Sequence, residues 1–320
     1  MNEFNAQLTV TTAGAGAAVV RTPDLLVWLA VGYAAILVPY YALLPRVTSK
    51  ARIAFAYVLG QFFASSRPEF GREEHQALLA LLLKFFFVPL MINWLLGNTS
   101  DVVGHWQALS APAASLFVWF NAHLYLLLFK IFLMVDVFLF TVGYIIEIPA
   151  LGNEIRSVDP TVAGWLACLA CYPPFNQALG SFFPWQSTDF PKFSSESIHL
   201  ALNCTILVAM AIYAWASLAL GLRASNLTNR GIVSRGPYAW VRHPAYAVKN
   251  IAWWIGALPA VGAAFAQSFA AGAWALACVA AWTVTYVLRA LTEERHLLTL
   301  ENGYAQYVLR VRYRFIPKLC

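Results

Sequence analysis

The chain has 320 residues, of which 60% are hydrophobic and 11% are charged, and its formal net charge is +6. Soluble globular domains carry roughly 25% charged residues, so this composition excludes an ordinary soluble enzyme and indicates that the chain needs lipid as its solvent. The positive charge could suggest a nucleic-acid partner. Its Lys and Arg residues, however, fall in the loops between apolar stretches instead of forming one basic surface, so we expect no nucleic-acid partner.

Seven apolar stretches are about as long as a helix that crosses a hydrocarbon core of roughly 30 Å. In chain order they are residues 24–44, 76–96, 114–146, 161–179, 198–222, 245–265 and 269–290. They predict an all-α fold, a polytopic transmembrane helical bundle of about seven spans. Two stretches are irregular, because Pro173-Pro174 interrupts residues 161–179 and residues 114–146 are too long for one straight crossing. Either could be tilted, re-entrant or split.

Basic residues favour one side of this bundle. They follow the first, third, fifth and seventh stretches, whereas three other loops, residues 97–113, 180–197 and 266–268, hold only Lys192. Because cytoplasmic loops carry an excess of Lys and Arg, we expect the N-terminus outside and the C-terminus in the cytoplasm. The first 23 residues lack a charged start before an apolar core, so they do not resemble a secretory signal, and the first stretch is expected to remain as an anchor.

The chain divides near Ser195, after a polar stretch. Residues 1–195 are expected to be N-terminal transmembrane helices of no recognised role. They carry Lys84, Lys130 and Asp136 inside apolar stretches, where an ionisable group suggests a functional site, although a long side chain can also reach the interface. Within residues 196–320, the segment from Arg223 onward holds 11 of the 21 Lys and Arg residues, against three carboxylates. Chemistry on an anionic group would suit this second part.

The first motif precedes the sixth stretch, where residues 236–246 read Gly-Pro-Tyr-Ala-Trp-Val-Arg-His-Pro-Ala-Tyr. Gly-Pro marks a turn, and Pro244 suits the first turn of the following helix. Tyr238, Arg242, His243 and Tyr246 should therefore crowd a helix N-terminus, whose free N–H groups attract anions. The alternative is an interfacial anchor, because Tyr, Trp and Arg also gather at headgroup depth.

The second motif follows the seventh stretch, where residues 289–297 read Arg-Ala-Leu-Thr-Glu-Glu-Arg-His-Leu. If the helix continues, Arg289 and Glu293 lie one turn apart on one face. Tyr304 and Tyr307 follow in a basic segment. The alternative is an amphipathic helix that lies on anionic lipid.

Together the two motifs resemble the isoprenylcysteine carboxyl methyltransferase family, integral membrane enzymes that use S-adenosylmethionine. The family patterns G-x-Y-x-W-x-R-H-P-x-Y and R-x-x-x-E-E-x-x-L match residues 236–246 and 289–297 at every fixed position. The resemblance covers about residues 200–320 and makes residues 196–320 the expected methyltransferase core, with its cofactor pocket on the cytoplasmic face. It departs at Lys249-Asn250, where a Gly and aromatic residues are common, which puts the methyl acceptor in doubt more than the cofactor.

The resemblance also implies roles for single residues. Activity is expected from Arg289 and Glu294, with Arg242 as a further candidate, and Glu294 would bind the ammonium or ribose hydroxyls of S-adenosylmethionine. Arg289 would orient an anionic acceptor with two hydrogen bonds, which Lys could not copy. Lys249 and Asn250 are expected beside the acceptor, and the residues expected to bind the cofactor are Tyr238, His243, Pro244, Tyr246, Glu293, Glu294, Tyr304 and Tyr307.

The acceptor is expected to be lipophilic and to arrive from the bilayer, as an isoprenylcysteine carboxylate or another lipid-like acid would. An ionised carboxylate needs no general base. A small thiol or a phospholipid amine would have to lose a proton, and His243, His296 or Tyr307 could then serve as the base. The oligomeric state is not predicted.

Two other functions stay open. Membrane sterol reductases that use NADPH share the Arg-His-Pro-x-Tyr segment and an Ile-Pro ending, but the adjacent Glu293 and Glu294 favour methyl transfer because a polyanionic cofactor would favour Arg or Lys there. A transporter or lipid-binding scaffold could instead be built around Lys84, Lys130 and Asp136. No G-x-G-x-x-G follows a predicted strand, so a Rossmann domain is not expected.

The five Cys residues predict neither a metal site nor a disulfide. Most lie in apolar stretches, where Cys packs as a small hydrophobic residue. Cys168 and Cys171 are spaced as C-x-x-C but have no second pair and no nearby His, so they lack the pattern of a zinc site. Cys320 ends the chain outside a C-a-a-X frame, so it gives no prenylation signal.

Overall fold

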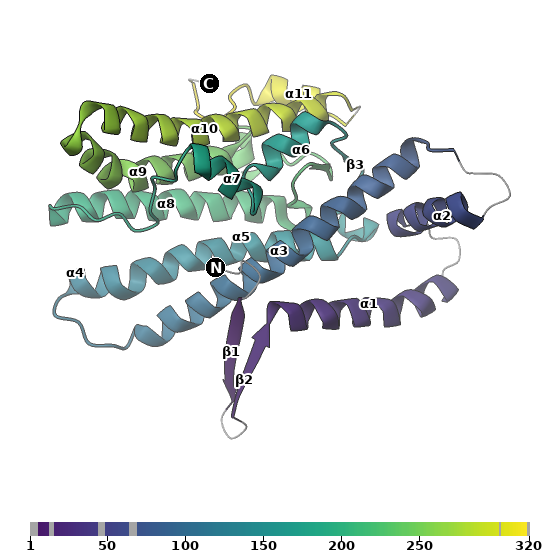
Figure 1. Ribbon diagram of the computed structural model, residues 1–320, viewed down its shortest axis with the longest axis horizontal. Coiled ribbons are helices and arrows are strands. Elements are labelled where there is room, and N and C mark those ends of the chain that lie inside the picture. The colour runs from purple at the N-terminus through teal and green to yellow at the C-terminus, as the bar shows by residue number, and fades with distance from the viewer. Residues whose placement is uncertain (1–5, 13–15, 44–48, 64–68, 301, 319–320) are drawn as a thin grey trace.

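A computed structural model of the protein describes residues 6–12, 16–43, 49–63, 69–300 and 302–318. Four helical runs in it are long and apolar enough to cross a membrane, namely Arg72–Ala108, Leu116–Ile145, Glu196–Arg223 and Phe269–Leu298. Together with α9 (Pro244–Gln267), they form a bundle (Figure 1). In it, α3 (Arg72–Ala108) packs on α5 (Tyr125–Ile145), α5 on α8 (Glu196–Leu220), α8 on α9, and α9 on α10 (Phe269–Leu298). The chain is an integral membrane protein with a mostly helical fold.

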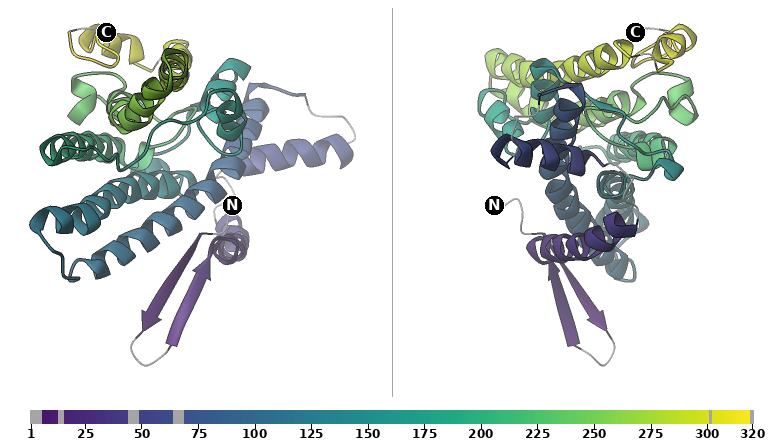
Figure 2. Two further views of the ribbon diagram at one scale, coloured as in Figure 1. Left: turned by 60° about the vertical axis from the view of Figure 1, so that its left-hand side comes forward. Right: turned by 90° about the vertical axis from the view of Figure 1, so that its right-hand side faces the viewer.

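The N-terminal elements attach to one helix of this bundle. Strands β1 (Gln7–Thr12) and β2 (Gly16–Arg21) form an antiparallel hairpin that projects from the helices (Figure 2), and α1 (Thr22–Leu43) and α2 (Lys50–Phe63) follow. The base of the hairpin is tied to α3 (Arg72–Ala108), because Asn93 Oδ1 accepts hydrogen bonds from the Ala6 N–H at 3.0 Å and from Thr22 Oγ1 at 2.9 Å.

The long third apolar stretch is one helical run with an irregular turn near its start. It consists of α4 (Leu116–Trp119), a π-helical turn η1 (Phe120–Leu124) and α5 (Tyr125–Ile145). Ser115 caps its start by accepting a hydrogen bond from the Val118 N–H at 3.2 Å. A π-helical turn inserts extra backbone into a helix, and the run continues through it from Leu116 to Ile145 as one candidate span.

The fourth apolar stretch is split, as its prolines allowed. After η2 (Pro149–Leu151) and β3 (Ser157–Val158), it forms two helices of eight residues, α6 (Val162–Leu169) and α7 (Phe175–Phe182), each too short to span a membrane. The segment nevertheless runs along the bundle. Cys168 packs against α3, the Phe183 carbonyl accepts from Trp282 Nε1 of α10 at 3.0 Å, and the Asp189 carbonyl accepts from the Tyr125 hydroxyl at the start of α5 at 2.7 Å.

The predicted count of about seven spans therefore stays a prediction. Four runs meet the length and apolarity of a span, and α1 contributes only a shorter apolar stretch, Thr22–Ile36. Helix α9 (Pro244–Gln267) has 24 residues and is long enough to cross the core, but Lys249 and Asn250 lower its apolarity. Residues 161–179 are not one helix.

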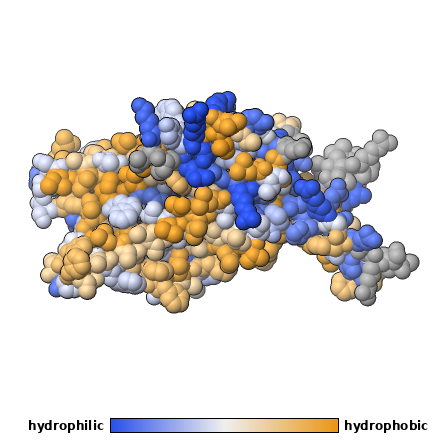
Figure 3. Space-filling view, turned by 90° about the horizontal axis from the view of Figure 1, so that it is seen from above, coloured by the Kyte–Doolittle hydropathy of each residue, from blue (hydrophilic) through white to orange (hydrophobic). Residues whose placement is uncertain are grey.

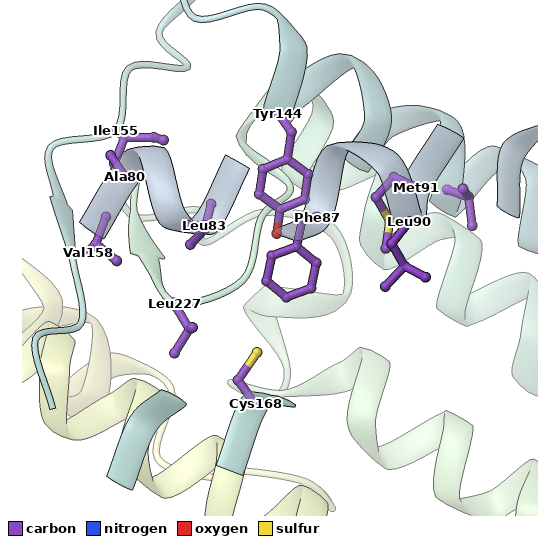
Figure 4. Packing of buried hydrophobic residues seen from close by; sticks show 11 residues of the cluster. Ala80, Leu83, Phe87, Leu90, Met91, Tyr144, Ile155, Val158, Cys168 and Leu227 are labelled. Carbon is purple, nitrogen blue, oxygen red and sulfur yellow. The ribbon is translucent and has the colours of Figure 1, made fainter. Parts of the chain in front are cut away.

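A core of buried apolar residues joins the two parts of the chain near the site. Phe87 of α3 stacks on Tyr144 of α5 with 5.2 Å between ring centroids, and Cys168 and Leu227 pack against the same group (Figure 4). Strand β3 also pairs with β4 (Thr228–Asn229), which precedes the first motif. The segments on both sides of residue 195 thus form one packed unit at this end of the bundle.

Local sequence sets the boundaries of the last three long helices. Helix α8 (Glu196–Leu220) leads through η3 (Gly221–Arg223) to η4 (Gly236–Ala239), and Pro244 then begins α9. Ser268 ends α9 and caps α10 (Phe269–Leu298), because its hydroxyl accepts from the Ala271 N–H at 3.1 Å. Helix α11 (Tyr304–Arg310) starts after Gly303, which adopts a left-handed φ of 83°.

The polar segments therefore meet at one end of the bundle. Figure 3 shows hydrophilic side chains gathered on one side of the face that carries α10 and α11, and hydrophobic side chains over the other side. This uneven distribution is the one expected of a membrane protein with a polar end.

Candidate active site

A cavity of about 460 Å³ opens at the polar end of the bundle. Its walls come from both parts of the chain: α3, α5 and Tyr172 on one side, and α8, α9, α10, α11 and residues 223–246 on the other. Ligand pockets of small molecules usually measure about 300–1,000 Å³. The cavity therefore has the volume of a small-molecule site.

The first motif supplies one wall of the cavity. Gly236 has a left-handed φ of 60°, which lets the chain turn into η4 and aim Tyr238 at the cavity. The ring of His243 stacks on that of Tyr246 with 5.5 Å between centroids and 11° between planes. Both rings line the cavity, whereas Pro244 is buried behind them as the first residue of α9.

The second motif supplies the facing wall. Arg289 and Glu293 lie one turn apart on α10, as predicted, and Arg289 Nε donates to Glu293 Oε1 at 3.1 Å. The same oxygen accepts a hydrogen bond from the Tyr246 hydroxyl at 2.5 Å. The two motifs, more than 40 residues apart in sequence, are thus joined directly inside the cavity.

Aromatic rings enclose the guanidinium of Arg289. Its Cζ lies 5.0 Å from the ring centroid of Tyr246, 5.4 Å from that of Tyr172 and 5.8 Å from that of Tyr286. Only 4% of Arg289 is exposed, so these cation–π contacts are largely desolvated and hold the guanidinium in one orientation.

Glu294 faces away from the cavity, although it is adjacent to Glu293. Its Oε1 accepts from Arg242 Nε at 2.7 Å and lies 3.1 Å from His243 Nε2, and its Oε2 accepts from Arg314 Nε at 3.0 Å. Glu294 is only 3% exposed, and both of its carboxylate oxygens already contact protein side chains, those of Arg242, His243 and Arg314. It does not line the cavity, whereas Glu293 does.

Arg242 anchors the C-terminal segment to the start of α9. Its Nη1 donates to the carbonyls of Val311 at 2.8 Å and of Arg312 at 2.6 Å, and its backbone N–H donates to the Tyr313 carbonyl at 3.0 Å. The neighbouring His243 N–H donates to the Arg314 carbonyl at 2.8 Å. These contacts hold residues 311–314 across the first motif.

Tyr304 and Tyr307 of α11 also line the cavity, and the Tyr307 hydroxyl donates to the Tyr238 carbonyl at 2.8 Å. Burial raises the pKa of Tyr304, Tyr307 and Tyr238 well above the ordinary value of a phenol. All three hydroxyls therefore stay protonated at physiological pH, which suits them as hydrogen-bond donors and makes Tyr307 a poor general base.

The two other predicted bases already have partners. His243 contacts Glu294, as described above, and His296 Nε2 lies 3.2 Å from the Ser157 hydroxyl. His296 lines the cavity and is mostly buried. Each of these contacts uses Nε2, so Nδ1 of either ring remains the nitrogen that could take a proton from an acceptor.

Lys249 and Asn250, both expected beside the acceptor, differ in position. Lys249 lines the cavity. Asn250 does not, and its side-chain amide donates to the Tyr246 carbonyl at 2.9 Å. Within the part of the chain that the structure describes, Asn250 Oδ1 is buried without a hydrogen-bond partner.

Several cavity residues could not be found from the two motifs. The Asn226 side chain accepts a hydrogen bond from Arg289 Nη2 and donates one to the Tyr172 hydroxyl at 3.1 Å, and the Asn226 backbone N–H donates to the Tyr144 hydroxyl at 2.7 Å. It therefore fixes the side of the guanidinium that Glu293 leaves free. The only sequence signal was that Asn226 lies in the polar segment between the fifth and sixth stretches.

The three intramembrane charges of the N-terminal part do not form one group. Lys84 pairs with Glu147 at 2.7 Å, and Lys130 pairs with Asp101 at 2.8 Å, both outside the cavity lining. Asp136 alone of the three lines the cavity. A transport site built around all three residues has no common location in this arrangement.

Comparison with protein-family models matches residues 197–299 to the isoprenylcysteine carboxyl methyltransferase (ICMT) family. Neither the comparison with curated proteins nor the comparison with solved structures gave a match. The matched range is less than half of the chain, but it contains both motifs and confirms that this part is ICMT-like. The segment is similar to a family of membrane methyltransferases, and the N-terminal elements, Tyr304 and Tyr307 lie outside the match.

Proposed function

We propose that this protein is an S-adenosylmethionine-dependent methyltransferase whose acceptor is lipophilic, such as an isoprenylcysteine carboxylate or another lipid-like acid. The observation that carries the proposal is the meeting of both motifs in one cavity, where Tyr246 of the first motif and Arg289 of the second share the carboxylate of Glu293. Residues 196–320 are the proposed catalytic core.

The residues present fit S-adenosylmethionine. The cavity has a suitable volume, and Glu293 offers an accessible carboxylate to a cationic or hydroxyl-rich ligand. The rings that already hold the guanidinium of Arg289 are of the kind that attracts a sulfonium as well. When bound, this cofactor supplies a methyl group attached to a positively charged sulfur.

Tyr238, His243 and Tyr246 are the proposed cofactor-binding residues of the first wall, and Tyr304 and Tyr307 extend it from α11. Glu293 binds the cofactor's ammonium or ribose hydroxyls, a role that the resemblance assigned to Glu294. Glu294, Arg242 and Pro244 then act by positioning: they hold His243 and the start of α9 where the cavity needs them.

Arg289 orients the acceptor in this proposal. Its Nε and Nη2 are held by Glu293 and Asn226, and three rings fix its plane. Methyl transfer is a direct displacement, so catalysis depends mainly on alignment and on keeping water away from the reacting atoms. A fixed guanidinium in an aromatic pocket provides both.

The acceptor reaches the cavity from the bilayer, with its polar head at the membrane face where the basic segments lie. The alternation of basic loops supports a cytoplasmic location of this face and of the C-terminus, with the N-terminus outside. A carboxylate acceptor agrees best with the site, because the guanidinium of Arg289 lines the cavity and an ionised carboxylate needs no general base.

Calorimetric titration of the purified protein in detergent micelles with S-adenosylmethionine and, separately, with NADPH tests the proposal. We expect saturable binding of S-adenosylmethionine that weakens in Glu293→Gln and is unchanged in Lys130→Met, a matched control outside the cavity. Binding of NADPH without binding of S-adenosylmethionine would reverse the assignment in favour of a reductase.

A further inference from the structure

A second polar group lies in the cavity, apart from the two motifs. It consists of Asp136 from α5, Tyr213 and Ser217 from α8, and Lys249 from α9, all of which line the cavity. Asp136 Oδ2 accepts a hydrogen bond from the Tyr213 hydroxyl at 2.6 Å, and Oδ1 accepts one from the Ser217 hydroxyl. Lys249 Nζ donates to the Tyr213 hydroxyl at 3.5 Å. Asp136 lies before residue 197 and so outside the family match.

The ammonium of Lys249 is held mainly by rings. It lies 4.9 Å from the ring centroid of Tyr213, 5.7 Å from that of Trp253 and 5.9 Å from that of Tyr286. Among the described residues, Tyr213 is its one hydrogen-bond acceptor, and that bond is long. Because an ammonium carries three N–H donors, Lys249 keeps donors for a ligand in the cavity.

Other lysines within the membrane helices are arranged differently. Lys84 and Lys130 each pair directly with a carboxylate, at 2.7 and 2.8 Å, outside the cavity. Lys249 and Asp136 are instead joined through the Tyr213 hydroxyl. The carboxylate therefore balances the charge of the ammonium without accepting a hydrogen bond from it. A charge buried in a membrane protein needs such compensation, and here the compensation leaves the cation open to the cavity.

Lys249 also lies near Arg289. The ring of Tyr286 is shared by both cations, with Arg289 Cζ at 5.8 Å and Lys249 Nζ at 5.9 Å from its centroid. Both cations line the cavity beside this ring, and an anionic oxygen group is the ligand that such a pair of cations attracts. Apolar residues of α3 and α5, among them Met91, Leu133 and Phe140, line the cavity near Asp136 and suit the apolar part of the same ligand.

We infer that Lys249, positioned by Asp136 through Tyr213, binds the carboxylate of the methyl acceptor together with Arg289, so that the N-terminal part of the chain takes part in selecting the acceptor. This inference rests on the proposed methyltransferase function. In the reaction, one carboxylate oxygen forms a C–O bond to the methyl carbon while the C–S bond breaks and its electron pair stays on sulfur. The negative and positive charges are both consumed, and no proton is released.

The chemical nature of the product provides the first test. The wild-type protein is incubated with methyl-labelled S-adenosylmethionine and the total lipid extract of its host membranes, and the labelled lipid is treated with alkali. A methyl ester releases its label as methanol, which is the expected result. A label that survives alkali, as on an ether, thioether or amine, overturns the inference while the methyltransferase function stands. Absence of label and of S-adenosylmethionine binding overturns both.

Variants provide the second test, with the lipid-extract concentration at half-maximal rate and the calorimetric Kd for S-adenosylmethionine as separate readouts. Lys249→Met and Asp136→Asn should raise the half-saturating extract concentration by about tenfold or more, the loss expected for one charged hydrogen bond, while the cofactor Kd changes less than about twofold. Lys249→Arg, which keeps the charge, should have a half-saturating extract concentration much closer to that of the wild type than Lys249→Met has.

The ion pair of Lys130 and Asp101 provides matched controls, because Lys130→Met and Asp101→Asn remove the same charges outside the cavity. Both should match the wild type in half-saturation. An unchanged half-saturating concentration in Lys249→Met overturns the inference. A parallel loss of cofactor binding and acceptor saturation in both Asp136→Asn and Lys249→Met would also contradict it, since that result marks the cluster as a support of the fold.

Discussion

The parts of the chain before and after residue 195 use their charges in opposite ways. In the N-terminal part, Lys50 and Lys84 both bind Glu147 at 2.7 Å, and Lys130 binds Asp101, all outside the cavity. In the C-terminal part, the charges of the two motifs converge on the cavity or on the residues directly behind it. An ionisable residue in a membrane helix is therefore not a site by itself, and its partners decide whether it remains available to a ligand.

Two exceptions to this division, Asp136 and Glu294, are informative, and Asp159 of the N-terminal part also lines the cavity. Asp136 belongs to the N-terminal part but lines the cavity. Glu294 belongs to the second motif, but it is enclosed by Arg242, His243 and Arg314. The following substitutions test whether charges that line the cavity act on methyl transfer and cofactor binding, while charges paired outside it act only on stability.

Arg289→Lys should have the largest effect, lowering turnover by about 100-fold. Lys cannot keep the hydrogen bonds to Glu293 and Asn226 while it orients the acceptor. The measurement is the rate of methyl transfer at saturating S-adenosylmethionine, with Lys130→Arg as a control for an exchange of cations outside the site. Wild-type turnover in Arg289→Lys would contradict the role of Arg289.

Glu294→Gln should mainly destabilise the protein, by about 3 kcal/mol, because it leaves the buried cation of Arg242 without its carboxylate. Thermal unfolding in detergent micelles measures the effect. If the variant instead has wild-type stability and loses only cofactor affinity, Glu294 binds the cofactor directly and the division between the two carboxylates drawn above is wrong.

Glu293→Gln should mainly weaken cofactor binding, whereas Glu294→Gln should mainly lower stability. It keeps the shape of the side chain, but it removes the charge that faces the cavity and that binds Arg289. We expect the Kd for S-adenosylmethionine to rise about tenfold, the equivalent of roughly 1.4 kcal/mol, with a smaller loss of thermal stability than in Glu294→Gln. The adjacent variants thus serve as controls for each other.

Glu147 sets a pH dependence of stability outside the site. Burial raises the pKa of Glu147, but Lys84 and Lys50 outweigh burial and lower it from 4.5 to about 2. Because the pKa is lower in the folded state, the stabilisation is fully present above pH 4.5 and is lost as pH falls towards 2. Thermal unfolding between these values should show this loss in the wild type, and Glu147→Gln should show a weaker pH dependence.

Lys130→Met should have the smallest effect. Lys130 and Asp101 are both partly exposed, and such pairs contribute about 0–1 kcal/mol. Methyl transfer, cofactor affinity and the half-saturating acceptor concentration should all match the wild type. A loss of transfer in this variant, with the protein still folded, would restore a functional role to the charges of the N-terminal part.

The sequence by itself determined the class of the protein, the ICMT-like segment, the turn-to-helix geometry of the first motif and the helical geometry of the second. Apolar length and charge content depend only on local composition, and Pro244 or an Arg289-x-x-x-Glu293 spacing acts within one helical turn. These features follow from the chain near each residue. Cys320 and the first five residues, which also entered the predictions, lie outside the described part of the structure.

Only the tertiary structure decided which residues face the cavity. Successive helical residues point about 100° apart, so one of two adjacent glutamates had to turn away, but the packing of α9, α11 and the C-terminal segment selected Glu294. Asn226, Tyr172 and Asp136 reach the cavity from segments far apart in sequence, and no local pattern brings them together. Pro173-Pro174 already allowed a split of residues 161–179, but the position of the resulting segment along the bundle depends on contacts with α3, α5 and α10 that composition does not record.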